Sequence, residues 1–598
     1  MRPLTWIAAP ALVLSSDLCT SQNGLNAIAS YYQPSIASAA RLINLAIAQT
    51  YSTSIAGRQR AIHVLNRLAF GPRPGDSGEI GSLGIQEFIH RQLDPTSIPE
   101  PPELLQRLDA LPTLKMNPVE LFEKFQLPVR QALKGDQAAK REARQAAKVV
   151  ITEAVEARII RALYGPRQLQ EVMTAFWFNH FNVFAGKQLC SVWTGAFEQE
   201  AIRPHTMGRF RDLLGATAHH PAMLFYLDNW QNTAPGAPGS HGKFDGINEN
   251  YAREVMELHT LGVNGGYSQQ DVIALAHILT GWSIERGGLG APARPRQHAQ
   301  QGQRPYNLAG IFRGPFSFRR FRPFVPAEGG WREPGQHQGR RQSRQGRMQN
   351  VAGQYGFMFY GRRHDFTDKT FLGREIKGGG LGEGEQALDI LAGSPATASH
   401  LSYKLAQYFV TDDPPPSLVK RMSARYLASD GNIRQVLEVI FSSAEFWDRR
   451  NYGNKFKTPY EYVISAARAT GVEVLNVNPL AGTMAALGMP LYGCQTPDGY
   501  KNTTEAWLNP DAMMLRLSFA TALGKGHLQL EHPVDPISGT PGFRTAAFIA
   551  EGNPAPQPAQ LALTLGDLFS SRTAEVIESA PPDLRAPLIL GSPEFMMR

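Results

Sequence analysis

The chain is poor in cysteine and lacks any long apolar run beyond its N-terminus. Its 598 residues include only Cys19, Cys190 and Cys494. None of their spacings is a CxxC, CxxCH or Cys/His zinc pattern, so no structural zinc site or c-type haem attachment is predicted. No later stretch approaches the roughly 20 apolar residues of a membrane span, so no integral membrane anchor is expected.

The standard catalytic signatures are also missing. The sequence has no GxSxG elbow, HExxH pair, P-loop or GxGxxG dinucleotide turn. The spacing around His259 is not the Glu-x-x-His of di-iron bundles either, because His259 follows Glu257 by two residues and Glu254 by five. Any chemistry must therefore be inferred from polar residues that lie in unexpected places.

Acidic residues are scarce in one segment. Residues 286 to 355 contain 13 Arg, no Lys and two acids, whereas the whole chain carries a net charge of only +8. The basic charge is therefore local, and it does not indicate a specific nucleic-acid partner. This Arg-, Gly- and Pro-rich segment is predicted to be a long surface insertion that could attract an anionic polymer.

The N-terminus "MRPLTWIAAPALVLSSDLC" has one Arg, then an apolar run and small residues. This pattern predicts a signal peptide over residues 1–25 and a secreted or periplasmic protein, the alternative being a disordered or buried N-terminal segment. In an oxidising compartment Cys190 and Cys494 could form a disulfide that closes a long loop. Two buried free thiols are the alternative that the sequence leaves open.

Most of the remaining chain has helical periodicity, so the fold is predicted to be mainly α with few short strands. Residues 137–164 form the longest predicted helix, and Ser268, with Asp271 three residues later, has the spacing of a capping box. A strand or hairpin arm is expected around residues 355–366. The predicted organisation is a helical N-terminal half over 26–285, the insertion over 286–355, a helical C-terminal half over 356–525, and a Pro/Gly-rich connector with a final helix over 526–598.

Polar residues are dense in "GINENYAREVMELHTLG", residues 246–262. Asn248 is the predicted N-cap. In a regular α-helix Asn250, Glu254 and Glu257 would share one face, while Arg253 could form i,i+4 pairs with Glu249 and Glu257. This stripe is either a solvated, ion-paired face or a functional one.

A lone histidine, His180, stands in the aromatic run "FWFNHFNVF". The surrounding aromatic residues require a core, so His180 is expected to be at least half buried. It could be a structural imidazole, a positioned acid or base, or a ligand. Asn179 and Asn182 flank it, and His364–Asp365 forms a third polar node in a predicted loop.

Several motifs together resemble one large bacterial family, catalogued only as a domain of unknown function. They are "HVLNRLAFGPRPGD", "FWFNHFNVF", "NENYAREVMELHTLGVNGGYSQQDVIALAHILTGW", "HDFTDKTFLG", "TPDGY" and "LILGSPEFMMR". The resemblance runs from about residue 57 to the C-terminus. It implies an exported protein, often encoded beside a sulfatase-like protein, and a site shared by these polar motifs. Cys494 and the long insertion depart from the usual pattern.

These observations favour an exported enzyme that uses His/Glu acid–base chemistry on an extracellular polymer, with an anionic glycan as the expected substrate and hydrolase or lyase chemistry both open. The candidate catalytic residues are His180, Asn248, Glu249, Tyr251, Arg253, Glu254, Glu257, His259 and Asp365. The candidate substrate-binding residues are Asn179, Asn182, Lys187, Arg340 and Arg341.

Two alternatives remain at this stage. One is a metal- or haem-dependent oxidoreductase with His180 or His259 as ligand, or with a mixed set of His180, Asp365 and a carboxylate. The other is a non-catalytic envelope-assembly partner that binds the sulfatase-like protein or a polyanion through the insertion. The sequence assigns no cofactor and no oligomeric state.

Overall fold

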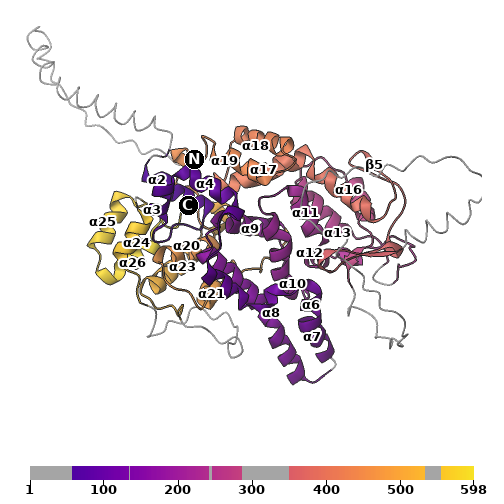
Figure 1. Cartoon of the computed structure of the whole chain (residues 1–598), viewed down its shortest axis with the longest axis horizontal. Helices are drawn as coiled ribbons and strands as arrows, with labels where there is room; N and C mark the ends of the chain where they lie inside the picture. Colours follow the sequence, from indigo (N-terminus) through magenta and orange to yellow (C-terminus); the bar gives the residue numbers. More distant parts are fainter. Residues whose placement is uncertain are drawn as a thin grey trace, which may run out of the picture.

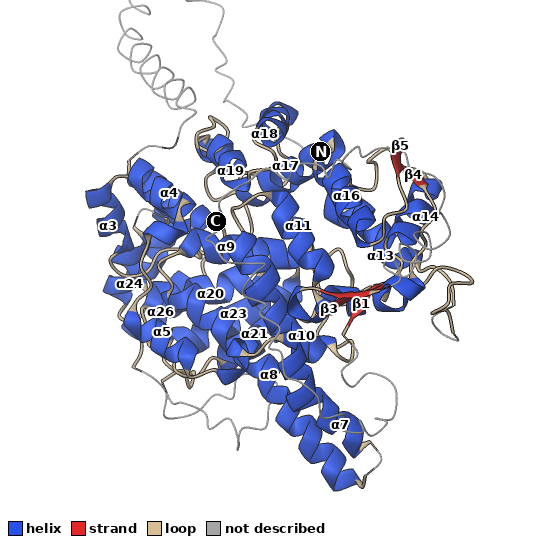
Figure 2. Cartoon of the chain, turned by 45° about the vertical axis from the view of Figure 1, so that its right-hand side comes forward, coloured by secondary structure: helices blue, strands red, loops and turns tan. Residues whose placement is uncertain are grey.

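The computed structural model describes residues 55, 57–133, 135–241, 245–285, 349–531, 554–566 and 568–598. Helices dominate this part of the chain, and strands are few and short, which confirms the predicted mainly-α fold (Figure 2). Within the described residues, no helix combines the length and apolar character needed to cross a bilayer. The predicted signal peptide, Arg340 and Arg341 lie outside the described residues.

The described chain begins with seven α-helices, α2 to α8, over residues 58–164. The longest helix is α8, whose bounds are those predicted from the sequence, and it begins after the N-cap Asp136. Figures 1 and 2 show α7 and α8 extending together from the body. The bounds are α2 (Arg58–Leu68), α3 (Asp76–Leu83), α4 (Ile85–Leu93), α5 (Pro102–Asp109), α6 (Pro118–Leu121), α7 (Leu127–Ala132) and α8 (Gln137–Tyr164).

The next group of helices carries most of the predicted polar residues. Two of its segments, η4 and η8, are π-helical turns. The predicted capping box of Ser268 and Asp271 is confirmed at the start of α14. The bounds are α9 (Gln168–His180), α10 (Cys190–Ala196), η4 (Phe197–Ile202), α11 (Phe210–His219), α12 (Pro221–Tyr226), α13 (Glu249–Glu254), η8 (Val255–Thr260) and α14 (Gln269–Ile278).

Two small antiparallel sheets follow α14 in the chain. The first has the order β1-β3-β2, with Trp282 opposite Phe359, and the second is the β4–β5 hairpin. Helix α16 packs closely on β1, because a Cβ at Gly384 would collide with the Trp282 ring. The strand expected around 355–366 is confirmed as β3, whereas β2 belongs to the end of the predicted insertion. The strands are β1 (Trp282–Ile284), β2 (Asn350–Ala352), β3 (Phe357–Tyr360), β4 (Lys369–Phe371) and β5 (Arg374–Ile376).

The second half adds two groups of helices, α16–α19 and α20–α26 (Figure 1). Asn432 caps α19, and Gly471 ends α20 in the left-handed conformation. The bounds are α16 (Leu381–Ala392), α17 (Pro395–Phe409), α18 (Pro416–Ala428), α19 (Ile433–Phe441), α20 (Pro459–Thr470), α21 (Asn478–Ala486), α22 (Thr504–Trp507), α23 (Pro510–Gly524), α24 (Pro558–Leu565), α25 (Ser571–Ser579) and α26 (Pro582–Leu590).

The possible disulfide is not formed in this structure. Cys190 and Cys494 are both buried free thiols. Cys190 contacts the carbonyl of Ala222, and Cys494 contacts that of Thr496. Of the two alternatives that the sequence left open, the structure has the unpaired one.

Candidate functional site

The candidate site begins at the C-terminal end of α9, where His180 lies among aromatic rings. Trp177 and Phe181 contact the imidazole edge-on, with centroids 5.4 and 4.7 Å away. His180 is only 2 % exposed, so the expectation of burial is confirmed. Its Nε2 lies 3.0 Å from the carbonyl oxygen of His259, and its Nδ1 lies 3.0 Å from Lys404 Nζ. Both ring nitrogens are therefore engaged: Nε2–H donates to the carbonyl, and Nδ1 accepts from the lysine.

Helix α17 brings Lys404 and His400 to this point from more than 200 residues away in the sequence. His400 Nδ1 lies 2.7 Å from the carbonyl oxygen of Thr260. The ring centroids of His259 and His400 lie 6.1 and 6.2 Å from that of His180. Burial lowers the pKa of Lys404 to about 8 and that of His259 to about 3, because a charged group loses hydration there. The result is an amine surrounded by three neutral imidazoles.

The polar segment 248–260 is less regular than the sequence indicated. Asn248 caps α13 as predicted, but the helix continues as the π-helical turn η8, in which Thr260 donates to the carbonyl of Val255 at 2.6 Å. The wider turn shifts the register of the residues after Glu254, so the predicted face of positions 250, 254 and 257 is not that of a regular α-helix. His259 thereby reaches the core, where its Nε2 is buried without a hydrogen-bond partner.

Ion pairing accounts for part of the acidic stripe. Arg253 contacts Glu249 at 3.3 Å and Glu257 at 3.2 Å, so both predicted i,i+4 pairs are confirmed. Glu254 differs, because in the described part of the chain its half-buried carboxylate forms no hydrogen bond or ion pair. Burial raises the pKa of Glu254, and the nearby charges of Glu257 and Asp498 raise it further.

A loop from the C-terminal half completes the site. Asn179 pairs with the backbone of Tyr500 through two hydrogen bonds of 2.8 and 2.7 Å. Asn182 donates to the carbonyls of Cys494 and Thr496 at 3.0 and 2.8 Å. The two predicted substrate-binding asparagines thus hold the TPDGY loop by its backbone. Asp498 on this loop forms an ion pair with Lys501 at 2.8 Å, and its charge also acts on Lys404.

Three other predicted residues stabilise the surroundings of the site. Lys187 donates to the carbonyl of Tyr226 and pairs with Asp228 at 2.9 Å. Asn248 donates to the carbonyl of Asp228 in addition to its capping bond. Tyr251 is 1 % exposed and belongs to the hydrophobic core. Their side chains are occupied by protein partners or by packing.

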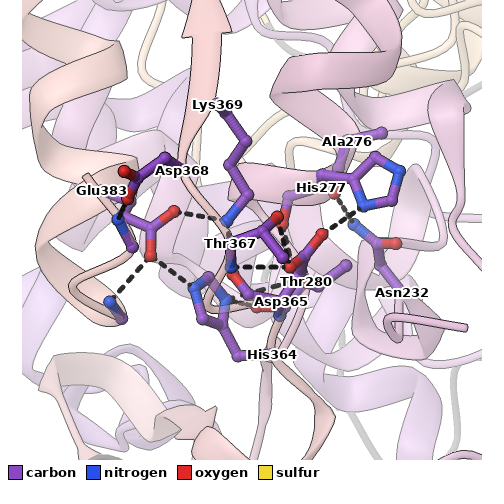
Figure 3. Close-up of polar contacts among 12 residues, drawn as sticks. Asn232, Ala276, His277, Thr280, His364, Asp365, Thr367, Asp368, Lys369 and Glu383 are labelled. Carbon is purple, nitrogen blue, oxygen red and sulfur yellow. Dashed lines mark hydrogen bonds and ion pairs between the residues drawn. The ribbon is translucent and has the colours of Figure 1, made fainter. Parts of the chain in front are cut away.

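Asp365 belongs to a separate polar cluster, drawn in Figure 3. Its carboxylate lies 2.8 Å from His277 Nδ1 and accepts hydrogen bonds from Thr367, which lower the pKa of Asp365. The neighbouring His364 pairs with Glu383 at 2.8 Å, and Lys369 pairs with the other oxygen of Glu383 at 2.6 Å. These contacts fasten the 364–369 loop to α14 and α16.

The structure therefore brings some of the predicted residues together and separates others. His180 and His259 meet, and the charges of Glu257 and Asp498 both act on Glu254. Asp365 has no direct contact with His180 within the described residues, so the mixed ligand set of His180, Asp365 and a carboxylate is not assembled. The described chain also contains no group of three His, Cys, Asp or Glu side chains arranged to hold a metal ion.

Sequence reasoning missed Lys404, His400 and Asp498. His400 and Lys404 are spaced i,i+4 in "SHLSYKLAQYF", so they lie on one face of a helix whose other residues are largely apolar. That face could have been noticed as a polar stripe. Asp498 lies in a motif that was already singled out, but nothing in the sequence placed that motif beside His180.

Residues 63–597 match the model of the family described as "Protein of unknown function (DUF1800)". The chain therefore belongs to this family, which confirms the resemblance inferred from its motifs. The search of curated proteins and the search of solved structures returned no match.

Proposed function

We propose that this member of the DUF1800 family is an exported enzyme that uses acid–base chemistry on an extracellular polymer, with an anionic glycan as its substrate class. The observation that carries the proposal is the presence, around Asp498, of a partnerless carboxylate, Glu254, and of an amine, Lys404, whose pKa is lowered to about 8. Both groups interact with Asp498. Acid–base catalysis is most efficient when the pKa values of the reacting groups lie near the working pH.

In the proposed chemistry Glu254 exchanges a proton with the substrate. Below about pH 8, Lys404 is charged. Lys404 would then neutralise an acidic group of the glycan, while His180 fixes the Lys404 amine through Nδ1. As a base, ionised Glu254 takes the proton next to the neutralised carboxylate, a double bond forms, and the bond to the leaving sugar oxygen breaks while water protonates that oxygen. As an acid, protonated Glu254 donates its proton to the glycosidic oxygen, the glycosidic bond breaks, and water adds to the sugar and releases a proton to solvent. Both reactions use the same residues.

The substrate class rests on charge. The Arg-rich segment 286–355, most of which lies outside the described residues, has an excess of 11 positive charges in the sequence (13 Arg against two acids). A local positive field concentrates polyanions near a site, and salt screens this effect. Binding of the polymer should therefore weaken as ionic strength rises.

The test is a screen of the full chain against uronate-containing and sulfated polysaccharides. Ultraviolet absorbance of unsaturated products reports a lyase, and new reducing ends without that absorbance report a hydrolase. On any substrate found, we expect Glu254→Gln and Lys404→Met each to lose roughly 10²-fold or more in kcat/KM. The matched controls are Glu87→Gln and Lys420→Met, which alter exposed residues that do not belong to this site.

The pH profile provides a second readout. Activity should fall above about pH 8, where Lys404 loses its proton. Full activity in Glu254→Gln and His180→Ala variants would refute the assigned roles. Near-stoichiometric iron or a Soret band in protein purified without chelator would favour the oxidoreductase alternative instead.

A further inference from the structure

A second unusual group of charges lies away from the candidate site. Five basic side chains there are at most 5 % exposed, namely Arg67, Lys455, Lys457, Arg516 and Arg598. Two carboxylates compensate part of this charge: Glu461 pairs with Arg598 at 3.1 Å, and Asp412 pairs with Lys455. Three of the buried cations therefore have no carboxylate partner. An uncompensated buried charge is costly, so such an excess requires an explanation.

Part of the excess is relieved by aromatic rings and carbonyl oxygens. Arg516 lies over the rings of Phe456 and Tyr462, with its guanidinium carbon 4.3 and 4.7 Å from their centroids. Arg67 donates through Nη2 to the Asn451 carbonyl and to Asn454 at 2.8 and 2.7 Å. These contacts stabilise the cations without supplying negative charge.

Several donors of the cluster remain unused. Arg67 Nε and Nη1 and Arg598 Nε are buried without a hydrogen-bond partner. Lys457 donates to Ser465 Oγ at 2.8 Å and to the Phe595 carbonyl at 2.7 Å, and its Nζ lies 4.1 Å from the centroid of the Phe595 ring, so the third N–H of its ammonium group has no hydrogen-bond acceptor. Buried donors are nearly always satisfied in proteins, so these groups indicate a missing acceptor.

A small cavity lies beside two of these basic side chains, Arg598 and Lys457. Its volume is about 10 Å³, and Arg598, Lys457 and Asn66 contribute to its wall. This volume has room for about one water molecule or one monatomic ion. Gly71 also lines the cavity, and a Cβ at this position would lie 2.6 Å from Ser465 Oγ, so the absence of a side chain keeps the wall open.

The remaining polar groups of the cavity wall are compatible with a bound hydrogen-bond acceptor. Glu461 lines the cavity, but its oxygens already accept from Tyr408, Arg598 and Thr458. The Asn66 amide has no partner for Oδ1 and can turn to present its NH2 group instead. The charged groups of the lining are therefore two cations, Lys457 and Arg598, and one carboxylate whose oxygens already accept hydrogen bonds.

We propose that this cavity is a binding site for one small inorganic anion of the size of chloride, held by Arg598 and Lys457. The anion accepts from Arg598 Nε–H and from the free N–H of Lys457, and Asn66 completes its shell. The anion compensates the positive charge that Glu461 and Asp412 do not neutralise. The site is independent of the acid–base function proposed above.

Anion binding is linked to a proton on Lys457. Burial lowers the pKa of Lys457 to about 7; Glu461 opposes this shift, and Arg516 and Arg598 add to it. An anion next to the ammonium group favours its charged form, so chloride affinity is higher at pH 6 than at pH 8.

The direct test uses crystals of the full chain grown in chloride and measured at a wavelength where chlorine and sulfur scatter anomalously. We expect a peak in this cavity comparable to that of the Met596 sulfur. A water molecule without an anomalous peak would overturn the proposal.

Thermal unfolding provides the measurement in solution. At constant ionic strength, replacing gluconate by chloride should raise the melting temperature, more at pH 6 than at pH 8, because a ligand stabilises the state that binds it. Lys457→Met should abolish this chloride-specific shift, whereas the exposed Lys420→Met should keep it. Equal melting temperatures of the wild-type protein in both salts would also refute the site.

Discussion

At the scale of single residues, most polar groups of segment 248–260 are already bound to other protein groups. Arg253 is shared between Glu249 and Glu257, and Asn248 is used in capping. Glu254 is the acid of this segment that has no ion-pair or hydrogen-bond partner in the described chain. Glu254 and the Lys404–His180 pair are therefore the groups proposed to exchange protons with a substrate or to bind it.

Lys404 can be tested without knowing the substrate. Because burial lowers its pKa to about 8, we expect it to be acylated at a pH about two units lower than an ordinary lysine, whose pKa is about 10.4. The measurement is competitive labelling with an amine-reactive anhydride, followed by peptide mass spectrometry. The pH is varied from about 6 to about 11, a range that includes the titration of ordinary amines. The exposed Lys420 serves as the internal reference.

The charge of Asp498 should be visible in the same experiment. Asp498 raises the pKa of Lys404 against the dominant effect of burial, so Asp498→Asn should move the labelling midpoint to still lower pH. A midpoint that stays near 10 in the wild-type protein would contradict a desolvated amine at this position (about 10 being the usual lysine range).

At the scale of elements, the π-helical turn η8 and the TPDGY loop position the site. A π-turn inserts one extra residue into a helix, and such turns are frequent at functional sites. The loop is held against α9 by Asn179 and Asn182. Gly499 makes the close approach possible, because it has a positive φ of 72° and a Cβ there would collide with the Asn179 carbonyl oxygen.

This packing predicts that Gly499→Ala displaces the loop. We expect the substitution to weaken both Asn179 hydrogen bonds, to increase hydrogen exchange over residues 495–501 and to lower the melting temperature. Gly453→Ala is a matched control, because Gly453 also has a positive φ, 59°, but a Cβ at that position would have no heavy atom within 4 Å. Both variants share the cost of backbone strain, and only Gly499→Ala adds a collision.

Equal effects of the two substitutions would mean that conformational strain alone is responsible. The loop would then not depend on close contact with α9. Hydrogen exchange separates the two cases, since it reports on the loop itself rather than on global unfolding.

At the scale of the whole molecule, buried histidines should make stability depend on pH. Burial lowers the pKa of His63, His180 and His259, the last to about 3. In the unfolded chain a histidine has a pKa of about 6.5, so below that pH the unfolded state binds more protons than the folded state. The stabilisation is complete above about pH 6.5 and is lost as the pH falls towards the folded-state pKa values.

The expected slope is about 1.4 kcal/mol per pH unit for each such histidine well below about pH 6.5. The measurement is chemical unfolding at a series of pH values between about 7 and 5, around the usual histidine pKa. His63→Gln keeps a donor for the Phe446 carbonyl. It should reduce the slope of the unfolding free energy against pH by the contribution of one histidine. The exposed His90→Gln should leave it unchanged, and an unchanged slope in both variants would contradict the prediction.

The sequence by itself determined the local structure. Several local features follow from residues that lie close together in the chain. They are helix α8, the caps Ser268, Asn248 and Asn432, the C-terminal Gly471 of α20, and the i,i+4 pairs of Arg253. Periodicity, capping and charge spacing act over a few residues, so a single sequence is sufficient to read them. The family also followed from contiguous motifs.

Only the tertiary structure decided which polar groups meet. Lys404 lies 224 residues after His180 in the sequence, and Tyr500 lies 321 residues after Asn179, yet both pairs form hydrogen bonds. Asp365, which looked equally suitable, is instead bound to His277. No local rule fixes such contacts, because they depend on how whole helices pack. For the same reason the raised pKa of Glu254 and the lowered pKa of Lys404 exist only in the folded chain, where burial and distant charges act on them.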